Sequence, residues 1–288
     1  MCLAAFALAC HDDFALVLAA NRDEFFERPS APMAWWDAGG EQDARPILAG
    51  RDLRGGGTWL GLNRQGRLAL LTNIRTGRGS PPGVPSRGEL VVDWLASNAS
   101  IDSLHDRARA RGHVDYNLVT ADLGAPSGGL SAAGPTGPDT TPAWHWTSST
   151  CERPEPIVTA EDGHVFALSN GRLDEPWPKL VALRSRLGEA VRGARSDRPA
   201  ELIGQVFAAL ADDRRASDEQ LPSTGVPLPV ERMLSSAFIR SEDGRYGTRC
   251  STVLLLQRSV GARVIERSFD RQGQISGQID IRLPGWPG

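Results

Sequence analysis

The chain has 288 residues, of which 40% are hydrophobic and 23% are charged, and its formal net charge is -3. A composition of this kind is typical of a globular protein that buries a full core. The nearly balanced charge excludes the basic surface on which proteins that bind nucleic acid or acidic membranes depend. No apolar run approaches the roughly 18 residues that a membrane-spanning helix needs.

The N-terminal residues MCLAAFALAC resemble a secretion signal only superficially. No Lys or Arg precedes Arg22, and the apolar run is interrupted by His11-Asp12-Asp13. A secretion signal has a basic start and a cleavage site with small residues. We therefore expect this segment to be a strand of the fold and the protein to be cytoplasmic.

The four cysteines, at positions 2, 10, 151 and 250, form no CxxC pair and have no zinc-ligand spacing with the five histidines. In a cytoplasmic protein they are expected to be free thiols. No metal site is predicted.

The first predicted elements in chain order are strands. Two short apolar runs, Leu3 to Ala9 and Phe14 to Ala20, are joined by a polar turn and predict a hairpin. The polar residues Asn21 to Glu24 follow directly, and they form either an ordinary surface turn or part of a site at the mouth of a sheet. After a polar connection, a second pair of strands is predicted over Thr58 to Asn63 and Arg67 to Asn73.

The rest of the chain alternates between helical pairs and groups of strands. Helical spacing predicts helices over Glu89 to Asn98, Ile101 to Arg111, Pro176 to Val191 and Glu201 to Leu210. Strands are expected over Tyr116 to Leu123, AWHWTSS, HVFALSN, Met233 to Ile239, Cys250 to Gln257, Val264 to Phe269 and Gln278 to Leu283. The stretches 74–88, 124–142 and 214–230 are rich in Gly, Pro or polar residues and are expected to be loops.

Strands that come in hairpin-like groups, separated by helical pairs, predict an α+β fold with antiparallel sheets. Two sheets, each covered by one helical pair, would form a four-layer α/β/β/α sandwich. We expect this sandwich to be a single domain over residues 1–288.

Cys2 is the first candidate for chemistry. An initiator Met that precedes a small residue is normally removed, which would leave a thiol and a free α-amine on one residue. The ordinary pKa of an α-amine is about 7.7 to 8.0, so this amine can serve as the base for the thiol beside it. The alternative is a buried thiol without a role, which is the common fate of a free Cys.

Four polar residues at strand ends could complete a site around Cys2. A nucleophile of this kind needs a carboxylate for its amine and donors for a developing oxyanion. Each residue by itself is more often a turn residue, but together they form a coherent set. The four are Asp23, Asn73, Asn170 and Arg249.

The chain resembles the NRDE family, also called the transport and Golgi organisation protein 2 family. The resemblance is carried, in order, by AANRDEF, GGGTWLG, RGEL, YNLV, LSNGRLDEPWPK and YGTRCSTVLLL, from Cys2 to about Phe269. It implies the fold of the N-terminal nucleophile hydrolases, which agrees with the predicted sandwich.

A wider resemblance is to the choloylglycine hydrolase and penicillin V acylase group. Its GxNxxGxxxxxxN phrase is similar to GLNRQGRLALLTN, which would give Asn73 the oxyanion role. The nucleophile would be Cys2, the later asparagine Asn170 and the late arginine Arg249. Arg22 and Asp23 are the candidates for the arginine and aspartate of the group, although Asn21-Arg22-Asp23-Glu24 departs from its Arg-x-x-Asp phrase.

The resemblance implies two functions of different classes. One is a hydrolase that cleaves an amide or thioester through an acyl-enzyme on Cys2. The other is a carrier of haem or of acyl-CoA or another lipid, because members of the NRDE family are associated with haem trafficking and acyl-CoA binding. No cofactor is required by the first function, and any haem would be non-covalent because no CxxCH motif is present.

Further residues are candidates for contact with a small-molecule ligand. Iron of a bound haem could be held by Cys2, Cys10, His11 or His164, although a single His is more often structural. Contacts to a ligand phosphate or carboxylate are expected from Asn21, Glu24, Arg75 and Arg78. For Arg75 and Arg78, the alternative is that they lie in a solvated loop. No nucleic-acid partner is expected.

Overall fold

The apolar residues at the N-terminus form inner strands of an antiparallel sheet in the computed structural model, which describes residues 2–39, 45–79, 81–124, 144–160 and 163–287. The chain divides into two units that are interleaved in sequence. Unit 1 comprises Met1–Glu27, Arg75–Arg78 and Thr159–Gly285, and unit 2 comprises Arg28–Ile74, Gly79–Val158 and Trp286–Gly288. The single domain expected over residues 1–288 stays a prediction, and each unit is considered by itself.

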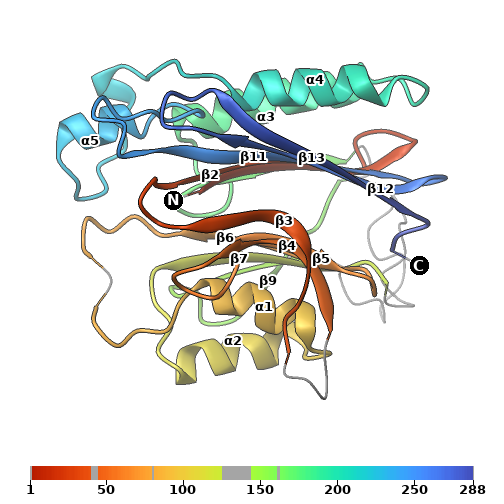
Figure 1. The fold of residues 1–288 in the computed structure, drawn as a ribbon, viewed down its shortest axis with the longest axis horizontal. Helices are drawn as coiled ribbons and strands as arrows, with labels where there is room; N and C mark the ends of the chain where they lie inside the picture. The colour runs from red at the N-terminus through yellow and green to blue at the C-terminus, as the bar shows by residue number, and fades with distance from the viewer. Residues whose placement is uncertain (1, 40–44, 80, 125–143, 161–162, 288) are drawn as a thin grey trace. The chain divides into compact units, whose positions relative to one another are not determined.

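Unit 1 contains a six-stranded sheet in the order β10-β1-β2-β11-β12-β13 (Figure 1). All of the pairings are antiparallel. Cys2 is the first residue of β1, which lies between β10 and β2, so the expectation that the N-terminal segment is a strand of the fold is confirmed. The strands are β1 (Cys2–Leu8), β2 (Phe14–Phe25), β10 (His164–Leu168), β11 (Tyr246–Gln257), β12 (Gly261–Phe269) and β13 (Ile275–Pro284).

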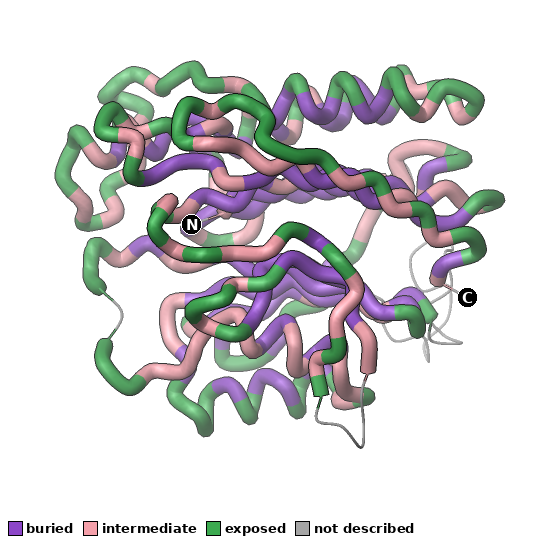
Figure 2. Tube along the Cα trace, viewed as in Figure 1, coloured by how far each residue is buried: buried purple, intermediate pink, exposed green. Residues whose placement is uncertain are grey.

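Helices α3 (Pro178–Arg192) and α4 (Pro199–Leu210) cover one face of this sheet. Successive side chains of a strand point to opposite faces, and the odd-numbered residues of β1 pack in one core with the buried stripes of both helices. Figure 2 shows these stripes as buried residues that alternate with exposed ones along each helix. The predicted helical pair is therefore confirmed, with α3 beginning two residues later than expected.

Strand β2 is longer than predicted. It continues through Asn21 to Glu24 and ends only at Phe25. These polar residues stay in the strand because β11 pairs with them as far as Tyr246, opposite Phe25. The strand expected over Phe14 to Ala20 is therefore too short, and of the two alternatives for Asn21 to Glu24 the ordinary surface turn is wrong, because these residues lie on a strand between two neighbours.

Unit 2 contains a seven-stranded antiparallel sheet in the order β3-β4-β5-β6-β7-β8-β9. Helices α1 (Gly88–Ala96) and α2 (Ile101–Ala110) contribute to the core of this unit, as predicted. The strands are β3 (Ser30–Asp37), β4 (Pro46–Asp52), β5 (Leu60–Asn63), β6 (Arg67–Asn73), β7 (Tyr116–Asp122), β8 (Trp144–Ser148) and β9 (Glu155–Pro156). Strands β3 and β4 were expected to be a polar connection. The segment was not predicted as strands because it contains Pro residues, but β3 lies at the edge of the sheet and β4 is its neighbour.

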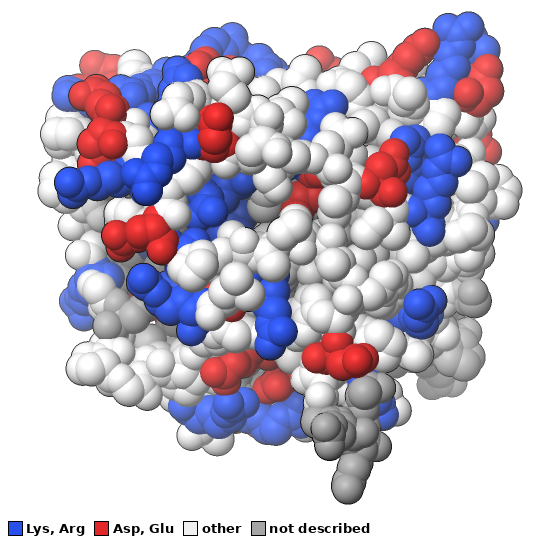
Figure 3. Space-filling view, viewed as in Figure 1, with Lys and Arg blue, Asp and Glu red and all other residues white. Residues whose placement is uncertain are grey.

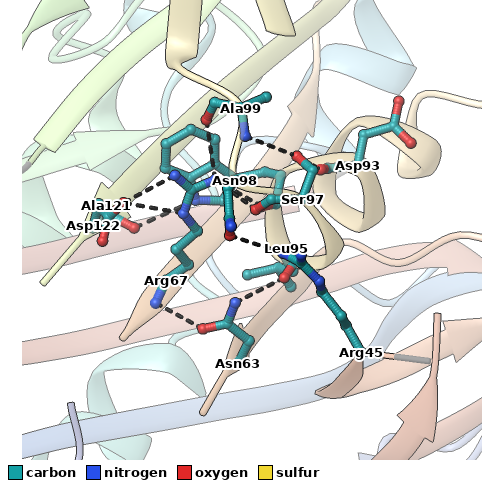
Figure 4. Close-up of polar contacts among 11 residues, drawn as sticks. Arg45, Asn63, Arg67, Asp93, Leu95, Ser97, Asn98, Ala99, Ala121 and Asp122 are labelled. Atoms are coloured by element: carbon teal, nitrogen blue, oxygen red, sulfur yellow. Dashed lines mark hydrogen bonds and ion pairs between the residues drawn. The ribbon is translucent and has the colours of Figure 1, made fainter. Parts of the chain in front are cut away.

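Arg67 joins the strands of unit 2 to the end of α1 (Figure 4). Its guanidinium donates to the carbonyl oxygens of Ser97 and Ala99 at 2.8 and 3.0 Å. The same group pairs with Asp122 at 3.0 Å and lies over the ring of Trp94 at 4.1 Å. One cation thereby satisfies carbonyls that the end of a helix leaves without intrahelical partners.

A short helix, α5 (Leu228–Met233), and turns replace the strand expected over Met233 to Ile239. Pro227 precedes the helix and Pro229 lies in its first turn, where a missing N–H is tolerated. Met233, Leu234 and Ile239 of the expected strand instead pack with Tyr246 in a small cluster. The loop expected over 214–230 also contains the 3-10 turn Asp218–Gln220. Of the loop expected over 124–142, only Gly124 lies within the described residues.

The predicted α+β class with antiparallel sheets is confirmed. Unit 1 supplies a helix layer and a sheet layer, and unit 2 supplies the same two, which are the four layers that the predicted sandwich requires. Among the described residues, no helix is both long and apolar enough to cross a membrane. Basic and acidic side chains are interspersed on the face drawn in Figure 3, in keeping with the small net charge.

Replacing Arg67 should destabilise the fold. Arg67→Leu leaves helix carbonyls and the Asp122 carboxylate without their charged partner, so we expect a loss of about 2–4 kcal/mol in the free energy of unfolding. Urea unfolding measures this loss. The control Arg54→Leu, at an exposed position of the same unit, should change it by less than about 0.5 kcal/mol. Equal effects of the two substitutions would contradict the bridging role.

Candidate active site

Cys2 is fixed by its two neighbouring strands. It lies directly opposite Arg22 on β2, and its carbonyl oxygen accepts a hydrogen bond from Ser169 Oγ at 3.1 Å. Burial raises the pKa of the Cys2 thiol, and the Asp23 carboxylate acts in the same direction, whereas Arg22 opposes it. The thiol is therefore held in its protonated form at neutral pH.

Arg22 and Asp23 lie on opposite faces of the sheet. Successive side chains of a strand alternate, so Arg22 shares a face with Cys2, and Asp23 shares the helix-covered face with Asn21. Arg22 also lies directly opposite Cys250 on β11. Three neighbouring strands thus place Cys2, Arg22 and Cys250 in one row.

Asp23 is a buried carboxylate, 1% exposed. Its Oδ1 accepts a hydrogen bond from Thr248 Oγ1 at 2.7 Å, across the β2–β11 pairing. Burial raises the pKa of Asp23, while the charges of Lys179 and Arg75 and the Thr248 hydrogen bond lower it. A carboxylate in this position can stabilise a protonated amine at the start of β1.

A chain of hydrogen bonds runs from α5 to the start of β1. Arg75 pairs with Glu231 at 2.6 Å, and both side chains are only 4% exposed. Arg75 Nη2 also donates to Asn170 Oδ1 at 3.2 Å, and its backbone N–H donates to the Asn170 carbonyl oxygen. Ser169, next to Asn170, bonds Cys2. Because Arg75 holds the amide oxygen of Asn170, it sets the orientation of the whole amide group.

Three residues of this region had no role assigned from the sequence: Glu231, Lys179 and Tyr246. Lys179 is buried in the first turn of α3. The hydroxyl of Tyr246 is buried and has no hydrogen-bond partner among the described residues. Both residues stand within phrases that carry the family resemblance, which was the only signal for them. Glu231 had none, because it lies between the loop expected over 214–230 and the strand expected from Met233, where no element was predicted.

Ligand contacts of Arg75 and Asn21 stay a prediction, but the side chains of both residues already have partners within the protein. Arg75 is neither a solvated loop residue nor a free cation, because it is buried against Glu231 and lies 5.0 Å from the ring centre of Trp177. The amide of Asn21 donates to the carbonyl oxygens of Leu210 and Ala237 and accepts from a serine, so its groups hold α4 to the sheet.

The other predicted site residues are placed as follows. Glu24 is half-buried on β2, and Arg78 is exposed. Arg249 lies inside β11 at a bulge rather than at the start of the strand, and its Nη1 donates to the Phe25 carbonyl oxygen at 3.0 Å. Asn73 ends β6, as expected, but belongs to unit 2. A shared site with Cys2 stays a prediction for Asn73 and for Arg249.

The candidate haem ligands are unevenly suited to bind iron. Both ring nitrogens of His11 are engaged, one with the Ala194 carbonyl oxygen and the other with the backbone N–H of Asp13. The His164 side chain is 46% exposed and lies 3.6 Å from an Asp174 oxygen. The described part of the chain contains no group of three or more His, Cys, Asp or Glu residues arranged to hold a metal ion.

The sequence as a whole has clear relatives. Residues 1–271 match the family described as Transport and Golgi organisation 2. The chain is 33% identical over 274 residues to the transport and Golgi organization protein 2 homolog of Bos taurus, and 31% identical over 273 residues to that of Homo sapiens. Each alignment covers 89% of this chain and 87% of the relative.

Solved structures of similar arrangement share little sequence with the chain. The C2A mutant of conjugated bile acid hydrolase from Clostridium perfringens is 9% identical, with a TM-score of 0.47 over 98% of this chain and 92% of that one. An N-acylethanolamine-hydrolyzing acid amidase ortholog of Caenorhabditis elegans is 11% identical, with a TM-score of 0.45 over 88% and 92%. The sequence relatives, not these structures, establish the family.

Breaking the Arg75–Glu231 pair should be costly. Arg75→Met leaves the Glu231 carboxylate buried without its counter-charge, so we expect a loss of about 3–5 kcal/mol in the free energy of unfolding. In the double variant Arg75→Met with Glu231→Leu, no charge is stranded, so the loss should fall short of the sum of the two single losses by about 1–3 kcal/mol.

Urea unfolding of the wild type, the two single variants and the double variant measures the four free energies of unfolding that this comparison requires. Arg232→Met is the matched control, since Arg232 lies on the same helix and forms an exposed pair with Asp218. It should change the stability far less than Arg75→Met. Strict additivity of the two single losses would show that the buried pair is not coupled.

Proposed function

The chain belongs to the transport and Golgi organisation 2 family, and we propose that it is a hydrolase that cleaves an amide or thioester through an acyl intermediate on Cys2. The observation that carries the proposal is the position of Cys2 at the start of an inner strand, bonded through its carbonyl oxygen to Ser169. Asn170, the next residue, is oriented by a buried ion pair.

The nucleophile is formed by removal of Met1. The α-amine of Cys2 is then free, and its ordinary pKa of about 7.7 to 8.0 leaves a useful neutral fraction near pH 7. This neutral amine takes the proton from Sγ. The step offsets the burial that otherwise keeps the thiol protonated.

The thiolate attacks the carbonyl carbon of the substrate, and a bond forms between Sγ and that carbon. The tetrahedral intermediate collapses as the leaving amine or thiol takes the proton from the α-ammonium. Water then attacks the acyl-enzyme, with the α-amine as base, and releases the acid. Two steps of moderate barrier thereby replace one difficult step.

The surrounding residues have separate roles in this proposal. The Asp23 carboxylate stabilises the α-ammonium that forms in each half-reaction. The amide of Asn170 is the proposed donor to the oxyanion, for which a preorganised donor contributes about 3–4 kcal/mol. Arg75 is a positioning residue, because it acts through Asn170.

A cytoplasmic location is part of the proposal. A nucleophilic thiol must stay reduced, and all four cysteines are free. The substrate is a small acyl compound, and the reaction needs no bound cofactor.

One observation favours a second function, that of a carrier. The raised pKa of the Cys2 thiol describes a poor nucleophile for as long as Met1 is attached. A protein that keeps Met1 would use the same region as a binding site for haem or an acyl-CoA. In that case the sulfur contributes to binding only if it ligates iron.

Substitution of Cys2 separates the two functions. With S-phenyl thioesters and p-nitroanilides of fatty acids of increasing chain length as probes, intact mass should show an acyl adduct on the wild type. Cys2→Ala should lose the adduct and lower turnover by orders of magnitude, because binding alone cannot replace covalent catalysis. Cys2→Ser should keep a slow activity, since a hydroxyl is a poorer nucleophile.

The matched control is Cys10→Ala, which removes another half-buried thiol of unit 1 and should leave the adduct unchanged. Hemin and palmitoyl-CoA are titrated against the same four proteins. Absence of any adduct on wild-type protein shown by mass to lack Met1, together with undiminished binding of either ligand by Cys2→Ala, would exclude the hydrolase and leave the carrier.

A further inference from the structure

Lys179 is the only lysine of the protein. Of the 32 Lys and Arg residues in the sequence, the other 31 are arginines. An arginine stays charged at every pH at which the protein is folded, whereas a lysine can lose its proton when it is buried. The one position that departs from this uniform use of arginine lies in the region around Cys2.

The surroundings of Lys179 suit an amine better than an ammonium. The residue is 5% exposed, and its Nζ donates to the Leu234 carbonyl oxygen at 2.9 Å. Within the described residues it has no other hydrogen bond and no ion pair, so an ammonium would bury two further N–H groups without acceptors. Its place in the first turn of α3 adds the positive end of the helix dipole.

The charged and titratable groups that act on Lys179 come from three elements and from Arg75, which lies in the connection after β6. The pKa of Lys179 is lowered to about 8, with burial as the largest cause and the charge of Arg75 acting in the same direction. The influences that raise it come from Asp23 on β2, Cys2 on β1 and Glu231 on α5. Arg75 and Glu231 pair with each other, while Asp23 and Lys179 each shift the pKa of the other toward the charged form.

We propose that Lys179 is a positioning residue of the Cys2 site that acts by gaining and losing its proton. Charged, it neutralises Asp23 and favours the thiolate of Cys2. When Lys179 is neutral, the Asp23 carboxylate can instead stabilise the protonated α-amine of Cys2. The consequence for catalysis rests on the proposed function, whereas the proton exchange itself does not.

The first experiment observes Lys179 directly. Because the chain has one lysine, protein labelled with ¹⁵N-lysine gives a single side-chain Nζ signal, which is followed between pH 6 and 11. We expect a midpoint near 8. A midpoint at or above about 10, close to that of a free lysine, would overturn the proposal.

The second experiment measures the effect on Cys2. The rate at which iodoacetamide alkylates Cys2, followed on its own peptide by mass spectrometry, is compared between wild type and Lys179→Met. At pH 6.5 the variant should react at least threefold more slowly, because the ammonium no longer favours the thiolate. At pH 9.5, where wild-type Lys179 is neutral, the two rates should agree within about 1.5-fold. A rate ratio that does not change with pH would reduce Lys179 to a packing role.

The stability of the folded state supplies a third readout with a defined sign. An unfolded lysine titrates near 10.5, so between pH 8 and about 10 the unfolded state holds a proton that the native state has lost. The free energy of unfolding of the wild type, relative to Lys179→Met, should therefore rise with pH across this window. A relative stability that is flat or falls would contradict the proposed exchange.

These outcomes are separate from those of the proposed function. Neither the ¹⁵N titration nor the alkylation of Cys2 requires a substrate. If the ¹⁵N titration and the alkylation of Cys2 behave as expected but no acyl adduct forms, the role of Lys179 is supported and the hydrolase is excluded. If an adduct forms and the midpoint lies near 10, the hydrolase stands without this residue.

Discussion

The buried pair between Arg75 and Glu231 holds the candidate site together. It joins three segments that are distant in sequence: α5, the residues that follow β6, and the end of β10. Each charge would be costly to bury by itself, so the two constrain each other strongly. The position of Asn170, and through Ser169 that of Cys2, depends on this constraint.

The same constraint explains how a site can be both buried and polar. Glu231 accepts from Thr224 as well as from Arg75, so both of its oxygens have partners. Other buried polar groups of the same region use only part of their hydrogen-bonding capacity. In unit 1, for example, Lys179 has one hydrogen-bond acceptor, and the hydroxyl of Tyr246 has no hydrogen-bond partner among the described residues. Chemistry is best placed at groups whose protonation is not fixed by their neighbours.

Much of the fold could be predicted from local patterns, because alternation along β1 and helical spacing in α3 and α4 report which side chains face a core. The pairing of β1 with β2 followed from the hairpin pattern. The length of β2 did not, because Asn21 and Asp23 are polar residues that face a core. They are tolerated there only because Leu210, Ala237 and Thr248 satisfy them. The pairing of Arg75 with Glu231 joins positions 156 residues apart, and no local pattern reports such a contact.

The register of the first sheet also determines how the thiol of Cys2 can be oxidised. Cys2 and Cys250 lie on either side of Arg22, which places their backbones two strand spacings apart, or about 9–10 Å. A disulfide requires Cα atoms within about 7 Å, so the arginine strand acts as a spacer that prevents this crosslink. Oxidation of Cys2 can still lead to a sulfenic acid or to a mixed disulfide with a small thiol such as glutathione. A reductant can reverse either product without the strands having to separate.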